Sequence, residues 1–245
     1  MNILEINQNI SGRRKIKIVL HEIYPITSEW NENGITWLEQ YTRDNADTVK
    51  GMPLCAEFVD NDKDIPYGHG MTGIKGNIPV FEDSVQVGAF EDWSIEDLEI
   101  DGKIHKCLCG TGYINENRYP NFCAWIDKQI KDGNKIVGSV ETTGTPENDG
   151  EIIYRDGWKE KGRIPMIYDY SGYCIVTIRP ADDKAILLEF QEGTKVETEE
   201  NEFDNIFLDM LGERNAVDTS EFDGIFGEDL KPKEQIKTEF DDIFR

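Results

Sequence analysis

A serine and a histidine stand in settings that could support nucleophilic catalysis. Ser139 follows Gly138 in the short apolar run Ile136–Glu141, and a serine without a bulky neighbour on its N-terminal side can be approached by a substrate backbone. His69 lies upstream in a Gly-His-Gly turn, and a histidine near a serine can act as its general base. Because serines on strands are common and most are surface hydroxyls, the pattern indicates a candidate pair only.

Metal-ligating residue types are present, but their spacing is unspecific. His105, Cys107 and Cys109 could offer three zinc ligands on one face of a strand, with no second cluster to supply a fourth. The three histidines are scattered and form no motif typical of a metal-dependent hydrolase. We therefore expect no metal and no other cofactor. Five cysteines without paired C-x-x-C units argue against a disulfide framework and predict reduced, buried thiols.

Strands are expected to dominate the elements that position these residues. Alternation of apolar and polar residues and short apolar runs predict strands over 15–23, 53–59, 85–90, 103–113, 136–141, 151–154, 166–170 and 173–178, with 184–190 as a strand or a short helix. The dipeptide Asp101-Gly102 predicts a hairpin. The clear internal helix is Phe122 to Lys131. The predicted fold class is therefore α+β, mostly β, with few helices.

Composition separates a body from a C-terminal tail. The 245 residues are 38% hydrophobic and 31% charged, which suits one globular domain, residues 1–192, with an additional segment. Residues 193–245 hold 16 acidic and 6 basic residues, and such a composition predicts a flexible tail that does not fold alone.

The net charge of −23 argues against a nucleic-acid surface, because phosphate binding needs clustered Lys and Arg. No segment resembles a signal peptide, and no apolar run approaches the roughly 20 residues of a membrane span. We expect a soluble, cytosolic protein that binds neither nucleic acid nor membrane.

The tail contains one hexapeptide three times. The pattern Glu-Phe-Asp-x-Ile-Phe begins at Glu202, Glu221 and Glu239. Its apolar residues lie at i, i+3 and i+4 and would share one helical face, so each copy could fill a partner's groove, and three weak copies would add avidity. The residues expected to bind are Phe203, Ile206, Phe207, Phe222, Ile225, Phe226, Phe240, Ile243 and Phe244. In the alternative, the copies dock on the body or pair among themselves.

Three segments of the body occur in an order that a known family shares. Residues 51–58, 119–141 and 170–185 resemble, in turn, the strand before the histidine, the helix followed by the serine strand, and the closing strand with its Pro-Ala turn in the prohead (capsid maturation) proteases of tailed phages. These proteases share a fold with the herpesvirus assemblins. The resemblance covers roughly residues 50 to 190, and it implies an assemblin-like β-barrel.

The resemblance also implies roles for individual residues. Ser139 would be the nucleophile and His69 its base, with the substrate lying as an extended strand beside the serine. Asp169 is taken as the third residue, which orients the histidine. Asp156 is a second acidic candidate, and Glu141, on the same strand face as Ser139, is the local alternative. The Gly-rich setting of His69 departs from the apolar strand that the family leads us to expect.

These expectations describe a phage prohead serine endopeptidase that cleaves scaffold and capsid-protein segments during head maturation. It would act in the host cytoplasm, inside the procapsid. Its tail would bind the major capsid protein, scaffold would be a further partner, and the chain itself could form a homodimer. The segment 189–193 is a candidate self-cleavage site. In the alternative, the protein is a catalytically inactive scaffold or assembly protein that acts through its repeats. An acidic recruiting module, like the tails of single-strand-binding proteins, is a third class, although the body lacks the basic groove of such proteins.

Overall fold

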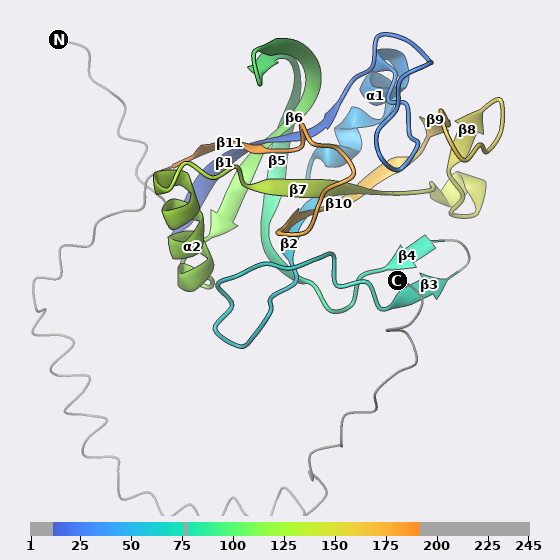
Figure 1. Cartoon of the computed structure of the whole chain (residues 1–245). Coiled ribbons are helices and arrows are strands. Elements are labelled where there is room, and N and C mark those ends of the chain that lie inside the picture. Colours follow the sequence, from blue (N-terminus) through green and yellow to red (C-terminus); the bar gives the residue numbers. More distant parts are fainter. Residues whose placement is uncertain (1–11, 76–77, 192–245) are drawn as a thin grey trace, which may run out of the picture. The chain divides into compact units, whose positions relative to one another are not determined.

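One seven-stranded sheet forms the frame of the body in the computed structural model, which describes residues 12–75 and 78–191 (Figure 1). The strand order is β11-β1-β6-β5-β2-β10-β7, and β2 and β10 are its parallel pair. Its strands are β1 (Arg13–Glu22), β2 (Pro53–Ala56), β5 (Val85–Ile100), β6 (Lys103–Asn115), β7 (Val137–Thr143), β10 (Asp169–Val176) and β11 (Leu187–Phe190). The prediction of a mostly β fold is confirmed.

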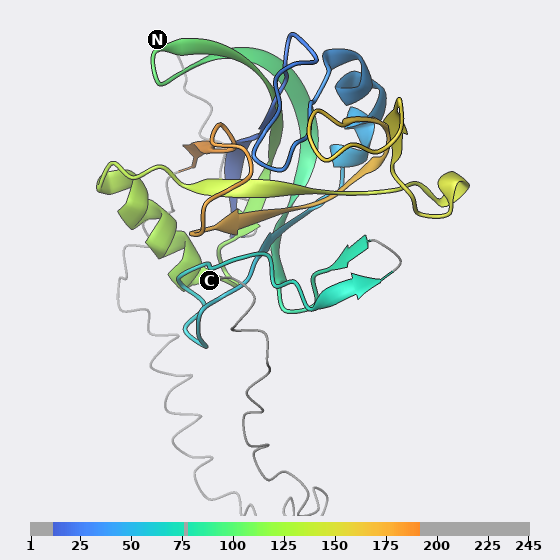
Figure 2. The same cartoon turned by 45° about the vertical axis from the view of Figure 1, so that its right-hand side comes forward.

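Smaller elements decorate this sheet. They are the pairs β3 (Gly73–Lys75) with β4 (Ile78–Val80) and β8 (Ile153–Arg155) with β9 (Ile164–Ile167), the helices α1 (Glu39–Asn45) and α2 (Pro120–Lys131), and the 3-10 turns η1 (Ala46–Val49) and η2 (Pro146–Asn148). Both views of the fold show the β3–β4 hairpin projecting away from the main sheet (Figures 1 and 2).

The large sheet curls without closing into a barrel in the part of the chain that the structure describes. Its two outer strands are linked by one isolated bridge between Val137 and Ile186. The amide of Gly138 donates to the carbonyl of Ala185 at 3.0 Å, and the amide of Leu187 donates to Ile136 at 2.9 Å. Because β11 is four residues long, it cannot pair along all of β7. The expected barrel is therefore replaced by an open sheet, and an assemblin-like fold is not established.

Alternation along the strands explains how the core forms. Ile16, Ile18 and Leu20 on β1 are buried, as the periodicity of the sequence predicts. Helix α2 begins with a proline in its first turn, where the missing amide costs no hydrogen bond, and it turns Phe122 and Ile126 into the same core. Because α2 is followed by β7, the packing of α2 in the core also fixes the start of the strand that carries Ser139.

The hairpin between β5 and β6 confirms the strongest local signal in the sequence. Asp101 and Gly102 have φ values of 53° and 77°, the left-handed pair that a type I′ turn requires. The sequence predicts a strand at 85–90 followed by a stretch interrupted by acids. The structure instead has one continuous strand with a register shift between Phe90 and Asp92, because pairing with β6 outweighs the poor strand preference of the acids.

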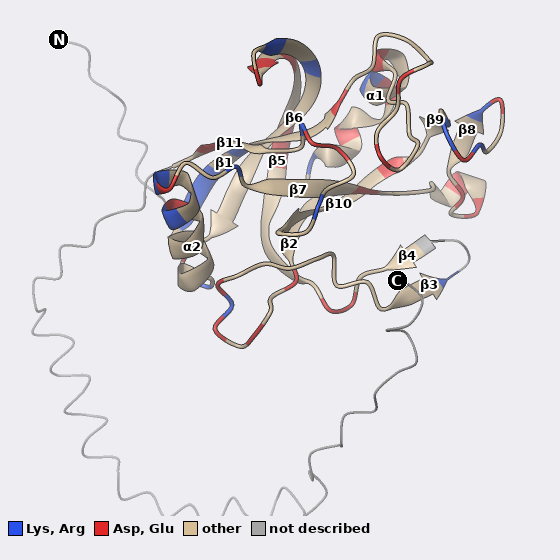
Figure 3. Ribbon diagram, viewed as in Figure 1, with Lys and Arg blue, Asp and Glu red and all other residues tan. Residues whose placement is uncertain are grey.

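The polar surface mixes both signs of charge. Figure 3 shows basic residues distributed over several elements, including α2 and the β5–β6 hairpin, with acidic residues among them. All five cysteines are free, and four of them are buried, as the sequence predicts. The described helices are too short or too polar to cross a membrane.

Candidate active site

His69 and Glu141 form a hydrogen-bonded pair beside β7. Nδ1 of His69 lies 2.7 Å from Oε1 of Glu141, and the side chains are 23% and 9% exposed. A carboxylate accepts hydrogen bonds, so the neutral imidazole donates from Nδ1 and keeps the lone pair on Nε2. This is the tautomer that a general base needs, because a carboxylate that fixes it leaves Nε2 free to take a proton.

The loop that carries His69 is held on both sides of the histidine. One carboxylate oxygen of Glu57 accepts the amides of Gly68 at 3.1 Å and Gly70 at 2.8 Å. Gly70 has a φ of +67°, and a Cβ there would collide with the backbone of Ser84, so glycine is required at this position. The Gly-His-Gly sequence therefore reflects a tightly fixed loop, and Glu57 is a positioning residue that sequence patterns gave no reason to select.

Cys174 completes the surroundings of the pair from the neighbouring strand. Its thiol lies 3.1 Å from the carbonyl of Gly68, which adds a further tie between β10 and the histidine loop. Burial, with the nearby carboxylate of Glu141 as a second cause, raises the pKa of Cys174 well above the ordinary value for a thiol. The thiol is therefore protonated at neutral pH, and it is a weak nucleophile.

Ser139 lies on the strand face that presents Glu141. The two residues are two positions apart on β7, and Cys174 is the direct cross-strand partner of Ser139, so all three side chains share one face. Among the described residues, no hydrogen bond joins Ser139 to His69. Catalytic hydrogen bonds are often long before substrate binds, so the arrangement is compatible with a Ser-His-Glu set.

Neither of the two aspartates considered from the sequence takes the orienting position. Asp169 lies at the first residue of β10, opposite Thr143, and makes no hydrogen bond to His69. Asp156 is a left-handed turn residue, 64% exposed, whose carboxylate pairs with Arg155. The carboxylate that is hydrogen-bonded to His69 is that of Glu141, which a period of two holds on the face of Ser139.

One group of potential metal ligands emerges among the described residues. Ligand atoms of His69, Glu141 and Cys174 lie within 4.8 Å of one another. A metal there would have to displace the thiol proton of Cys174, whose pKa is raised by burial. His105, by contrast, binds Glu22 at 2.6 Å, and its expected zinc partners Cys107 and Cys109 lie in an apolar cluster. No described residues gather around them as a metal site.

Two glycines allow close packing, Gly172 on this face and Gly138 on the opposite face of the sheet. A Cβ on Gly172 would meet the Glu141 carboxylate, and a Cβ on Gly138 would meet the ring of Tyr173. Neither glycine has a positive φ, so both are needed for space rather than for backbone conformation. Gly172 thus keeps room for the carboxylate that binds His69.

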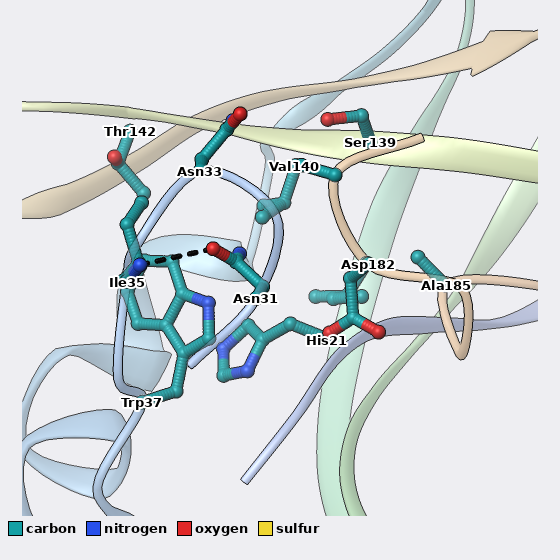
Figure 4. A pocket seen from close by; sticks show the side chains of 12 residues that line it. His21, Asn31, Asn33, Ile35, Trp37, Ser139, Val140, Thr142, Asp182 and Ala185 are labelled. Carbon is teal, nitrogen blue, oxygen red and sulfur yellow. Dashed lines mark hydrogen bonds between the residues drawn. The ribbon is translucent and has the colours of Figure 1, made fainter. Parts of the chain in front are cut away.

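A second polar cluster lies around a cavity beside β7 (Figure 4). His21 is fully buried. Its Nδ1 donates to the carbonyl of Glu22 at 2.9 Å, its Nε2 lies 2.8 Å from the hydroxyl of Tyr170, and its ring stacks on Trp37 at 4.4 Å. Burial lowers the pKa of His21 to about 4. The sequence offered no signal for this role, since an isolated histidine on a strand has no motif.

The buried imidazole predicts an acid-sensitive fold. The unfolded chain takes up a proton at His21 below its ordinary pKa of 6.5, and the folded chain does so only below about 4. The free energy of unfolding should therefore fall by about 3 kcal/mol from this group as pH drops from 6.5 to 4, and stay constant below that. Chemical denaturation at several pH values should show a shallower slope for His21→Gln than for the wild type. Equal slopes would contradict the prediction. Asp182, whose pKa burial raises, acts in both proteins and cancels in the comparison.

The nine apolar residues of the three repeats lie outside the described residues, as does the end of the 189–193 segment. The described part of that segment is well anchored. The backbone carbonyl of Gln191 accepts Nε of the buried Arg14 at 2.7 Å, and its amide donates to Lys15 at 2.9 Å. Arg14 in turn makes a two-pronged hydrogen bond to Asp127 on α2 at 2.7 and 2.8 Å.

Comparison with known proteins gives one match. Neither the curated proteins nor the solved structures include a significant match to the chain. A family model described as the YonD N-terminal domain matches residues 14–213, which include the whole site around His69 and Glu141. Since this match spans most of the sequence, the chain belongs to the YonD N-terminal domain family.

Proposed function

We propose that the body is a serine endopeptidase of the prohead type, with Ser139 as nucleophile, His69 as general base and Glu141 as the residue that orients the base. The observation that carries this proposal is the 2.7 Å hydrogen bond from His69 to Glu141 on the face of β7 that also presents Ser139. The resemblance of three body segments to prohead proteases supports the same assignment. An assemblin-like origin of the open sheet is part of the proposal.

The chemistry follows from the tautomer of His69. Nε2 takes the proton of the Ser139 hydroxyl as Oγ attacks the scissile carbonyl, and Glu141 stabilises the imidazolium that forms. His69 then gives this proton to the leaving amine, and an acyl-enzyme remains on Ser139. Water hydrolyses the ester with His69 again as base, which restores the serine. A substrate strand would lie along the open edge of β7.

The biological setting is proposed as maturation of a phage procapsid in the host cytoplasm. Acting inside the procapsid, the protease would cleave scaffold and segments of the major capsid protein, which the three tail repeats would bind. Self-cleavage would fall beyond Gln191, because Arg14 and Lys15 hold this residue at the end of the sheet. Intact-mass spectrometry of the purified chain, incubated alone and with capsid subunit, tests the proposal. The proposal would be contradicted if the masses of both proteins stayed unchanged, also at a high concentration of the chain that would allow it to dimerise.

A specific observation also supports the inactive alternative. Because no described hydrogen bond links Ser139 to His69, the body could be a protease fold that serves as a scaffold or assembly protein. In that case the tail carries the function. Capsid subunit that binds the chain and assembles normally, without any cleavage product, would favour this second function.

The repeats provide a prediction that both functions share. Changing Phe203, Phe222 and Phe240 together to alanine should weaken binding of the capsid subunit by at least about tenfold, because each truncation removes a large apolar anchor and the copies act together. Changing one of the three should have a much smaller effect. Sedimentation or surface-plasmon measurements with the full chain check this. Equal binding by the triple variant and the wild type would show that the repeats are not the contact.

Gly172 provides a test of the catalytic arrangement that changes none of the three proposed catalytic residues. Gly172→Ala should lower the cleavage rate by about tenfold or more, because the added methyl displaces the Glu141 carboxylate from His69. Gly102→Ala is not a suitable control, since φ is positive there, whereas Gly73→Ala is, because its Cβ would have no neighbour within 4 Å. Full activity of folded Gly172→Ala would show that the Glu141 position is not critical.

A further inference from the structure

The outer edge of β7 offers backbone groups to a bound strand. Ile136 and Gly138 hydrogen-bond outward, to Leu187 and Ala185. Along an antiparallel strand, the backbone N–H and C=O groups of successive residues point alternately to the two neighbouring sides. The backbone groups of Val140 and Thr142 therefore point outward, as those of Gly138 do. Beyond Gly138, however, no described strand pairs with them. An extended peptide could therefore continue the line that residues 185–187 begin.

A cavity of about 40 Å³ lies directly along this free edge. Its walls include His21, Asn31, Trp37, Ser139, Val140 and Asp182. Figure 4 shows Val140 pointing toward Asn31, while the hydroxyl of Ser139 lies on the other side of the β7 ribbon. Ser139 thus contributes to the cavity wall while its hydroxyl points away, and the cavity flanks the proposed cleavage site. It has room for more than one water molecule. A cavity of this volume can hold a carboxamide group but not an aromatic ring.

Two hydrogen-bond donors in the cavity walls have no acceptor among the described residues. Trp37 is 2% exposed, and its indole Nε1 has no acceptor among the described residues. Figure 4 shows this nitrogen on the side of the ring that faces Asn31 and His21. Asn31 uses its side-chain oxygen to accept the amide of Ile35 at 3.0 Å, which leaves its NH₂ group available.

Asp182 and His21, which also line the cavity, already have hydrogen-bond partners. The two carboxylate oxygens of Asp182 accept the backbone amides of Glu22 at 2.7 Å and Lys184 at 2.9 Å. Both nitrogens of His21 have partners, the carbonyl of Glu22 and the hydroxyl of Tyr170. A buried donor without an acceptor is costly, so the group that fits this cavity brings a hydrogen-bond acceptor.

We propose that this cavity is a specificity subsite for a glutamine or asparagine side chain of a peptide that pairs with the free edge of β7. The proposal rests on the proposed endopeptidase function. The amide oxygen of the side chain accepts hydrogen bonds from Trp37 Nε1 and the Asn31 NH₂ group. Apolar side chains leave these donors unpaired, and a glutamate brings a negative charge close to Asp182. The subsite therefore selects a neutral amide over both leucine and glutamate.

The test uses the full chain with Ser139→Ala, which binds peptide without turnover. Blocked pentapeptides of alanine and threonine carry glutamine, glutamate or leucine at the centre. NMR spectra of the chain with ¹⁵N-labelled tryptophan follow the indole N–H resonances, and the Trp37 signal is identified by its loss in the Trp37→Phe background. We expect the glutamine peptide to bind about fivefold or more tightly than the leucine peptide and to shift the Trp37 resonance.

Two variants remove one donor each. Trp37→Phe keeps an aromatic ring on His21, and Asn31→Asp keeps the oxygen that accepts the Ile35 amide. Each should reduce the preference for glutamine over leucine, and the remaining indole signals report whether the variant is folded. Equal affinities in the unmodified subsite, an unchanged Trp37 signal on binding, a preference retained in both variants, or no peptide binding at millimolar concentration would overturn the proposal.

The outcomes also separate this proposal from the proposed function. If the Ser139→Ala chain binds the glutamine peptide as expected and the wild type never cleaves it, the subsite stands and the protease assignment fails. If the wild type and the Trp37→Phe variant both cleave the capsid substrate, and at the same sites, the protease assignment stands and the subsite fails.

Discussion

Ser139→Ala is expected to reduce cleavage by at least about 10³-fold, because it removes the only atom that attacks the scissile carbonyl in the proposed mechanism. The measurement is the rate at which fragments appear in intact-mass spectra of the chain incubated with capsid subunit. Ser94→Ala is the matched control. Ser94 is also a strand serine, and its hydroxyl is bonded to Glu96 away from the His69 loop, so its loss should leave cleavage unchanged.

The same substitution should leave the fold intact. The hydroxyl of Ser139 makes no hydrogen bond to another described side chain, and a partly exposed serine can become alanine at a cost within about 0.5 kcal/mol. Thermal unfolding and binding of the capsid subunit should therefore match the wild type. If Ser139→Ala produces the same fragments at the same rate, Ser139 is not the nucleophile. The assembly-protein alternative gains support only if a contaminating protease proves to be the source of all these fragments.

Glu141→Gln is expected to lower the cleavage rate by about 10³-fold or more. A glutamine can donate from its NH₂ group to Nδ1 of His69, which stabilises the tautomer with a proton on Nε2, and that tautomer cannot accept the serine proton. The size of the side chain is unchanged, so the loss would report on the hydrogen bond rather than on packing. Initial rates on one defined peptide or on capsid subunit measure the effect.

Asp169→Asn is the paired control for this experiment. Asp169 lies at the start of β10 and is not bonded to His69, so its change should alter the rate by less than about twofold, as expected for a carboxylate outside the reacting group. The opposite ranking, with Asp169→Asn strongly impaired and Glu141→Gln active, would show that the orienting residue implied by the family resemblance is correct and that the observed pair is only structural.

Sequence periodicity predicted much of what positions this site. The β5–β6 turn, helix α2 and the strand that carries Ser139 all depend on local signals, namely a left-handed Asp-Gly pair, an apolar helical face and a short apolar run. Closure of the sheet could not be predicted in this way. It depends on how far the segments around Ile186 and Val137 pair, and this contact between residues distant in the sequence leaves no local signal.

The candidate site divides in the same manner. His69 and Ser139 could be selected because of their types and their glycine neighbours. Glu141 was visible as the carboxylate two residues beyond Ser139, but nothing in the sequence placed the His69 loop beside it, so Asp169 was chosen and Glu141 was kept as the local alternative. Glu57 and Trp37 could not be selected from the sequence, because their roles arise from the bonds that Glu57 makes to Gly68 and Gly70 and from a cavity that Trp37 lines.

Gly172 carries a consequence for the evolution of the YonD N-terminal domain family. The space beside this glycine is filled by the Glu141 carboxylate, so the two positions cannot vary independently while the carboxylate serves His69. If the proposed function holds, members that keep both residues together with a serine at position 139 should be proteases. Members in which a larger residue has replaced the glycine should have lost the acid and the serine as well. An alignment of the family, sorted by the residue at position 172, would then separate members that keep the acid and the serine from members that have lost them.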